Sequence, residues 1–107
     1  MIITTTETVP GRRIVRTLGL VRGTTIRARH IGQDLQASIR NLVGGEMVEY
    51  TKLIAESREQ AIDRAISEAE KLGADAIVAF RFSTSDVARG AAEVLAYGTA
   101  VVLEPEG

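Results

Sequence analysis

The sequence lacks cysteine and tryptophan, and it contains a single histidine, His30. Without cysteine the chain cannot form a disulfide, a thiolate nucleophile, a zinc–cysteine site or an iron–sulfur site. One imidazole also excludes, within one chain, any site that needs two histidines, such as the H-E-x-x-H zinc motif. The missing residues therefore exclude the common soft-metal and metalloprotease sites within a single chain.

Long apolar runs are missing as well. No run approaches the roughly 20 residues that a membrane-spanning helix needs. The first residues, MIITTTETVPG, carry neither the basic n-region nor the apolar h-region of a signal peptide. We therefore expect a cytoplasmic protein that is neither exported nor inserted in a membrane.

The 107 residues have 45% hydrophobic and 25% charged side chains, as is typical of one soluble domain spanning residues 1–107. A net charge of −1 provides no overall field that would attract nucleic acid. The charge is unevenly placed, because residues 1–30 hold six arginines and one glutamate, whereas the rest holds seven basic and thirteen acidic residues. Head-to-tail contact between copies would explain this split, and solvated charges explain it equally well.

Periodicity predicts the order β-β-α-α-β-β. The expected strands cover residues 2–6, 14–23, 76–82 and 94–103. Apolar positions recurring every three or four residues predict a short helix over residues 31–42 and a long helix over residues 47–72. Gly44 and Gly73 are expected to end these helices, and residues 83–90 to form a turn. The predicted fold is α+β, with a small, mainly antiparallel sheet, one short helix and one long helix.

The last two predicted strands are largely apolar on both faces. One long helix can cover only one face of a small sheet, so we expect a partner subunit to cover part of the other. Phe80 and Phe82 alternate onto one face and are expected in the core rather than in a base-stacking platform.

The first candidate site is Arg40 and Asn41, next to Gly44 and Gly45. Backbone N–H groups of the two glycines, near the start of the long helix, could hold a small anion or a carboxylate. The alternative is a helix–helix turn in which Arg40 and Asn41 cap carbonyl groups, and the sequence favours this structural interpretation.

Two further candidates are weaker. His30 and Asp34 are spaced to share one helix face as metal ligands, but Glu46, Glu49 or another subunit would have to complete the site. A surface pair at a helix start is the favoured interpretation. The hydroxyls of residues 4–6 and 97–99 would meet if the first and last strands paired, although hydroxyls without a neighbouring base are poor nucleophiles.

Together, several short motifs resemble the YbjQ-like family of small bacterial and archaeal proteins, which is often labelled heavy-metal-binding. The matching segments are Thr4-Thr5-Thr6, Pro10-Gly11, Leu18-Gly19-Leu20-Val21-Arg22-Gly23, Arg40-Asn41-Leu42-Val43-Gly44-Gly45, Tyr50, Leu72-Gly73-Ala74-Asp75-Ala76-Ile77 and Ala96-Tyr97-Gly98-Thr99-Ala100-Val101. The resemblance implies an α+β subunit assembled as a ring, a homopentamer, with no established activity.

The sequence therefore supports three hypotheses. The first is a non-enzymatic, ring-forming protein that binds a small anion or a metal ion between subunits at Arg40, Asn41, Gly44 and Gly45. The second is a metal-binding protein that uses oxygen ligands and His30, although a chain without cysteine suits thiophilic metals poorly. The third, an enzyme using Tyr97 or the threonines, is the least supported. No cofactor is identified, the metal ligands stay unassigned, and nucleic acid and membranes are not expected partners.

Overall fold

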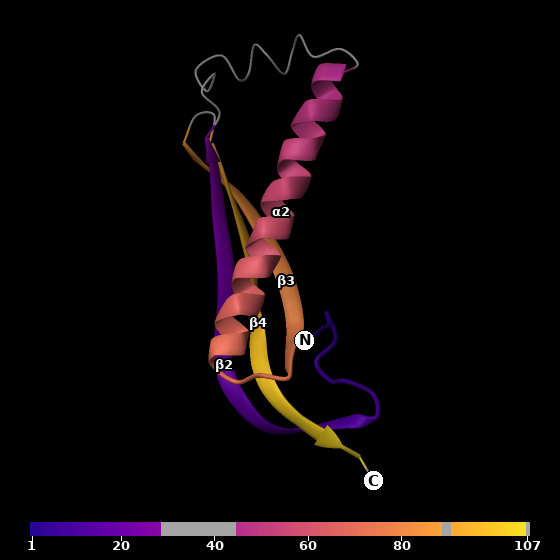
Figure 1. The fold of residues 1–107 in the computed structure, drawn as a ribbon. Helices are drawn as coiled ribbons and strands as arrows, with labels where there is room; N and C mark the ends of the chain where they lie inside the picture. The colour runs from indigo at the N-terminus through magenta and orange to yellow at the C-terminus, as the bar shows by residue number, and fades with distance from the viewer. Residues whose placement is uncertain (29–44, 89–90, 107) are drawn as a thin grey trace.

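The computed structural model describes residues 1–28, 45–88 and 91–106, which form a four-stranded sheet with a long helix on one face (Figure 1). The elements are β1 (Ile2–Ile3), β2 (Arg12–Ala28), α2 (Gly45–Lys71), β3 (Ala76–Ala88) and β4 (Ala91–Pro105). In the strand order β1-β3-β4-β2, β4 is antiparallel to both of its neighbours, and the short β1 runs parallel to β3. The predicted α+β class and mainly antiparallel sheet are confirmed. The short helix predicted over residues 31–42 lies outside the described residues.

Helix α2 matches the helix predicted over residues 47–72 within two residues at its start. Its small side chains Ala61, Ala65 and Ala69 are fully buried against the sheet, as the periodicity predicts. At its C-terminus the Ala74 N–H donates to the Ala69 carbonyl at 3.1 Å, and the Gly73 N–H donates to the Glu70 carbonyl at 3.0 Å. This is a Schellman motif, and Gly73 adopts the left-handed φ of 80° that the motif requires.

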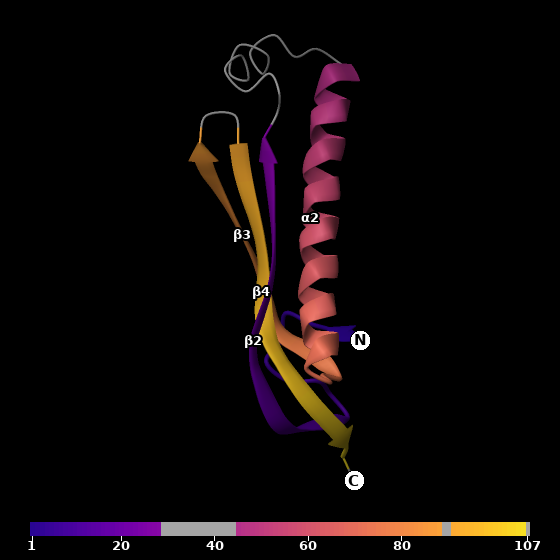
Figure 2. The same ribbon diagram turned by 60° about the vertical axis from the view of Figure 1, so that its left-hand side comes forward.

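The alanines let α2 approach β2 closely. At Gly23 a Cβ atom would lie 2.6 Å from the Ala65 nitrogen and 2.8 Å from the Arg64 Cβ, so only glycine fits there. Nearby, the buried Thr25 hydroxyl donates to the Ser57 carbonyl at 3.1 Å. Seen from the side, α2 lies against the sheet at its lower end and diverges from β3 toward its upper end (Figure 2).

Two irregularities in β2 change which of its side chains face α2, and so they correct the faces predicted from the alternation of residues. The sequence alternation puts Ile14, Leu18 and Leu20 on one face and Val21 on the other. In the structure, register shifts at Ile14/Arg16 and Thr17/Gly19 interrupt the period of two. Leu18 therefore packs with Val21 against α2, whereas Ile14 belongs to a cluster on the opposite face. Gly19, with a φ of 117°, provides the backbone conformation for the second shift.

The predicted turn over residues 83–90 is also corrected for residues 83–88, and residues 89–90 lie outside the described ranges. Strand β3 continues to Ala88 and pairs with β4 as far as Ala91. Ser83, Thr84 and Ser85 are compatible with a turn, but cross-strand pairing overrides this local preference. At the other end of the chain, the regular strand β1 covers Ile2–Ile3 rather than the predicted residues 2–6.

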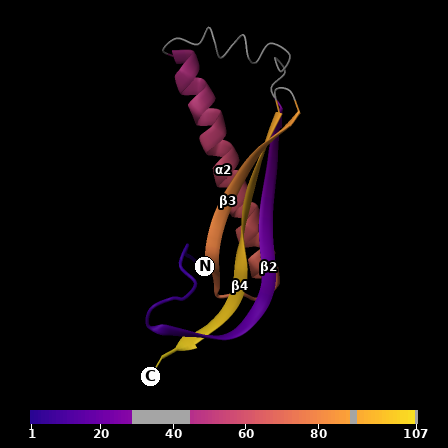
Figure 3. The same cartoon turned by 180° about the vertical axis from the view of Figure 1, so that it is seen from behind.

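The sheet has apolar clusters on both faces. The cluster under α2 includes Val21, Ile77 and Phe80. The second cluster, on the opposite face, contains Ala76, Val78, Val101 and Leu103, with Val9 and Ile14 packed against it. Val9, in the segment after β1, therefore covers part of this opposite face. The rear view shows this segment beside the lower part of β3 (Figure 3). The expectation of strands that are apolar on both faces is confirmed.

Candidate functional site on the open face of the sheet

The upper part of the face opposite α2 carries a mixed group of basic, hydroxyl and apolar side chains, which we call the open face. Its residues alternate along the strands with buried residues that face the helix, such as Val21, Ala96 and Ala100. The members are Leu20, Arg22, Thr24, Ile26, Arg81, Ser83, Glu93, Leu95, Tyr97 and Thr99. Leu20 and Ile26, on the outer strand β2, are each 61% exposed.

A basic row crosses the centre of the open face. Tyr97 of β4 lies opposite Arg22 of β2 and opposite Arg81 of β3. Directly opposed residues of antiparallel strands share a face, so the phenol is flanked by the two arginines. Arg22 and Arg81 are exposed, and Tyr97 is half-buried.

An irregularity in β3 brings Arg81 into this row. The register shifts between Val78 and Arg81, where Ala79 has a φ of 53°, an uncommon value for a residue with a side chain. The segment after β1 holds this irregularity, because the Ala79 N–H donates to the Thr6 carbonyl at 2.8 Å and the Phe80 N–H to the Thr4 carbonyl at 3.0 Å. Through the same nitrogen, the Arg81 guanidinium donates to the carbonyls of Thr5, at 2.8 Å, and Phe80, at 2.9 Å.

Hydroxyl groups surround the basic row. In the next row toward the hairpin end, Leu95 lies between Thr24 and Ser83, and in the row on the other side Thr99 lies beside Leu20 and Val78. Within the part of the chain that the structure describes, neither Arg22 nor Arg81 forms an ion pair with a carboxylate. The acidic member of the face, Glu93, is four residues from Tyr97 along β4, a separation of about 13 Å. The centre of the open face is therefore basic and rich in hydrogen-bond donors.

Exposed threonines after β1 form a separate local network. The Thr4 and Thr6 hydroxyls lie 2.7 Å apart, and the Thr6 hydroxyl donates to the Thr8 carbonyl at 2.6 Å. The proposed meeting of these hydroxyls with residues 97–99 is wrong, because β3 separates β1 from β4. Phe80 is buried as expected and contacts Phe82 edge-on at 5.5 Å, whereas Phe82 itself is 46% exposed.

The anion site predicted from the sequence is only partly described. Arg40, Asn41 and Gly44 lie outside the described residues, as do His30 and Asp34, and Gly45 is the first residue of α2. Sequence reasoning missed the row of Arg22, Tyr97 and Arg81, because the three residues are far apart in the chain and only the strand register brings them together. Alternation within β3 could have placed Arg81 on the face of the strand opposite to Phe80 and Phe82. No pattern in the sequence, however, identified Tyr97 as its cross-strand partner.

Within one subunit, the described residues provide no group of donors for a heavy-metal centre. The chain has no thiolate to offer, and among residues 1–28, 45–88 and 91–106 no three His, Asp or Glu side chains are grouped so that they could hold a metal ion. Among the helical residues that the structure describes, none forms a segment long and apolar enough to cross a bilayer.

Comparison with known families gives a match along nearly the whole chain. A YbjQ family model with the description "Putative heavy-metal-binding" matches residues 1–104. A UPF0145 protein from Methanosarcina acetivorans is 56% identical over 101 residues, which cover 94% of this chain and 95% of the relative. A UPF0145 protein from Clostridioides difficile is also 56% identical, over 99% of this chain and 95% of the relative. The names of these relatives state no activity.

A solved structure supports the fold. The chain is similar to a crystal structure from Pediococcus pentosaceus, a protein of unknown function in the DUF74 family, with a TM-score of 0.64. The alignment covers 97% of this chain and 98% of the crystal chain at 18% sequence identity. At this identity the similarity establishes the arrangement of the elements alone.

Proposed function

Because the chain belongs to the YbjQ-like family, we propose that it is a cytoplasmic, non-enzymatic binding protein whose subunits assemble as a ring, a homopentamer. The observation that carries this proposal is the uncovered apolar surface on both faces of the sheet. Leu20 and Ile26 lie uncovered on the open face, and Phe82 lies on the helix side of β3, where α2 has diverged from the sheet (Figure 2). Surfaces of this kind are typical of sites for protein contact.

The shape of the subunit supports assembly. Its radius of gyration is 17.4 Å and its longest dimension 58 Å. A compact domain of this length has a radius of gyration of about 13 Å. An extended subunit buries less of its own apolar surface, and a neighbouring copy would cover more of it.

The two uncovered surfaces differ from each other, which favours a ring. Contact between unlike surfaces is heterologous, and heterologous contacts close into rings when the rotation between copies permits. Strand β2, 17 residues long, also has an outer edge that pairs with no other described strand, and such edges are prone to pair with another chain. The unlike surfaces support head-to-tail contact, and the edge of β2 supports pairing with another copy.

Native mass spectrometry of untagged protein, purified without a chelator, tests the assembly and the ligand together. A pentamer is expected, and a stoichiometric excess of mass would reveal a retained ligand. A monomer at all concentrations would contradict the ring.

For the ligand, we propose a small anion held between subunits by Arg40, Asn41, Gly44 and Gly45, as the sequence suggests. Replacing Arg40 with alanine should weaken anion binding, because it removes charge-assisted hydrogen bonds to the anion, and it should leave the ring intact. Unchanged anion binding in this variant would remove Arg40 from the site.

The family description favours metal binding as the second candidate function. It requires oxygen ligands together with His30, drawn from several copies because one chain has only one imidazole. This candidate predicts that added metal raises the melting temperature, and that the rise is lost in His30→Ala. An identical melting temperature with metal and with chelator would contradict it.

A further inference from the structure

We propose that Arg22, Tyr97 and Arg81 form a binding site for a phosphate-class oxyanion at the centre of the open face. The inference rests on the proposed function for its ligand class, a small anion, and it adds a second anion site at residues other than Arg40 and the adjacent glycines. The site combines two cationic forks with a phenol hydroxyl in a single cross-strand row.

The spacing of the row suits one small oxyanion. Adjacent strands lie about 4.8 Å apart, so β2 and β3, which flank β4, are separated by about 10 Å. Two arginine side chains attached at that separation are long enough to contact one phosphate group from opposite sides. Tyr97 lies on the strand between them, and its hydroxyl can supply a further donor. Planar guanidinium groups match phosphate geometry with paired N–H donors.

Arg81 is anchored on the outer side of β3. Its contacts to the Thr5 and Phe80 carbonyls use one terminal nitrogen and hold the guanidinium beside the segment after β1, on the side of β3 away from β4. The N–H groups of the other nitrogens remain for a ligand, toward which the side chain would turn from these carbonyls. Because these anchors are neutral carbonyls, the positive charge is not cancelled. Arg13, in contrast, is paired with the Glu104 carboxylate at the end of the sheet.

The surroundings of the row favour an anion as well. The side chains of Thr24, Ser83 and Thr99 make no hydrogen bond with other residues in the described ranges, and all three lie in the rows next to Tyr97. The Glu93 carboxylate, about 13 Å away along β4, is beyond the screening length of about 8 Å at physiological salt. An anion at Tyr97 would therefore be close to two positive charges and far from the negative charge of this face.

The test is isothermal titration calorimetry of the wild-type assembly with inorganic phosphate at physiological salt. Saturable binding of one phosphate per subunit is expected at the open face, beside any phosphate that the Arg40 segment binds. Arg22→Gln and Arg81→Gln should each weaken binding by about tenfold or more, because each removes charge-assisted hydrogen bonds. Tyr97→Phe should weaken it by about threefold. Arg81→Lys keeps the charge but loses the fork, and it should fall between wild type and Arg81→Gln.

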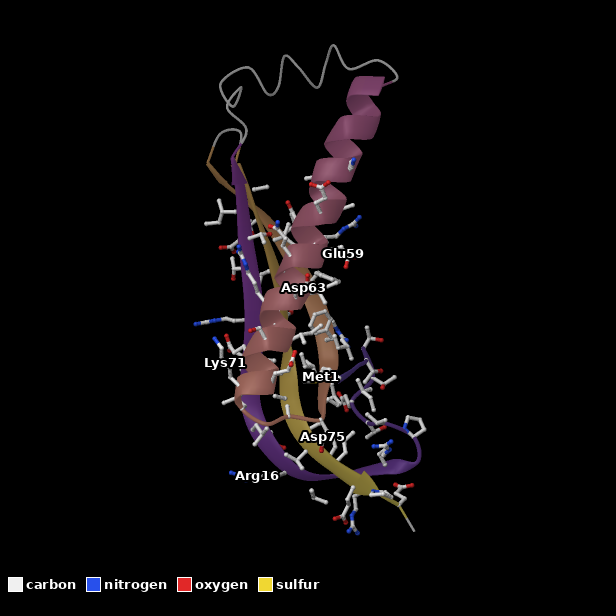
Figure 4. All side chains as sticks on the ribbon, viewed as in Figure 1. Met1, Arg16, Glu59, Asp63, Lys71 and Asp75 are labelled. Atoms are coloured by element: carbon white, nitrogen blue, oxygen red, sulfur yellow. The ribbon has the colours of Figure 1, made fainter. Side chains whose placement is uncertain are left out.

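Arg16→Gln is the matched control. Arg16 is an exposed arginine on the same strand as Arg22, but it lies near the opposite end of the sheet and points outward (Figure 4). The control should bind phosphate as the wild type does. An equal loss in Arg16→Gln and Arg22→Gln would contradict the site, because it would reveal nonspecific attraction to positive charge.

Two further readouts separate this inference from the proposed function. If Arg40→Ala abolishes phosphate binding while Arg22→Gln and Arg81→Gln bind normally, the anion is held by the glycine segment and the open-face site is wrong. If Arg22→Gln and Arg81→Gln lower the oligomer mass with phosphate affinity unchanged, the row is a subunit contact and the inference also fails. Circular dichroism melting of every variant confirms that the compared proteins are folded.

Discussion

At Gly23 the backbone of β2 meets the backbone of α2, and this single residue determines how closely the two elements pack. We expect Gly23→Ala to destabilise the protein by about 3 kcal/mol, because the added methyl group would overlap backbone atoms that cannot rotate away. Urea unfolding at a fixed protomer concentration measures the loss. Thr24→Ala, at the next residue but on the open face, is the control and should change stability by less than about 1 kcal/mol. Equal stability of Gly23→Ala and wild type would show that α2 does not pack at this distance.

Single residues also show which features of the fold and of the site could be predicted from the sequence and which could not. Gly73 was predicted to end the long helix and does so, because a left-handed residue after a helix has a local signature. Ala79 has no such signature, yet it adopts a φ of 53°. Its conformation is imposed by hydrogen bonds to the segment more than 70 residues earlier in the chain. The same irregularity sets the partner of Arg81, so the basic row could not be found from local patterns.

At the scale of elements, the C-terminal cap of α2 can be tested separately from the packing of the helix on the sheet. Gly73→Ala should cost about 1–2 kcal/mol, because a residue with a Cβ is strained in the left-handed conformation. No atom lies within 4 Å of the position a Cβ would take, so the cost is conformational rather than steric. Thermal melting measures it. Ser67→Ala, on the exposed side of the same helix, is the control and should leave the melting temperature unchanged or slightly raised. A Gly73→Ala melting curve that matches this control would contradict the capping role.

The elements themselves were largely predictable, and their irregularities were not. Helix α2 has a strong apolar period over more than six turns, and the core positions Ala61, Ala65 and Ala69 follow from it. In β2, by contrast, two register shifts change which side chains face the helix. In β3, Ser83 to Asp86 have the composition of a turn but form part of an extended hairpin. Pairing with β4 determines both the register shifts of β2 and the extension of β3. This pairing cannot be deduced from the sequence of a single strand.

For the whole molecule, the unlike uncovered surfaces make assembly testable by mixing. In a head-to-tail ring, the open-face residue Leu20 of one copy and the helix-side residue Phe82 of another belong to different halves of the contact. We therefore expect Leu20→Asp and Phe82→Asp each to yield monomers, because a buried unpaired carboxylate is costly. Analytical ultracentrifugation measures the mass of each variant. Leu72→Asp is the control, because Leu72 is similarly exposed, at 47%, but lies after the end of α2.

Mixing the two interface variants should then give a one-to-one heterodimer that grows no further. Each variant retains one intact half of the contact, so a single interface can form between them, and the two halves left over are both impaired. An isologous interface predicts a different result, because both halves would come from the same patch and the mixture would stay monomeric. A full ring formed by either variant on its own would place the substituted residue outside the contact. Native mass spectrometry distinguishes these outcomes directly, since the masses of monomer, heterodimer and ring are multiples of the 11.5 kDa subunit.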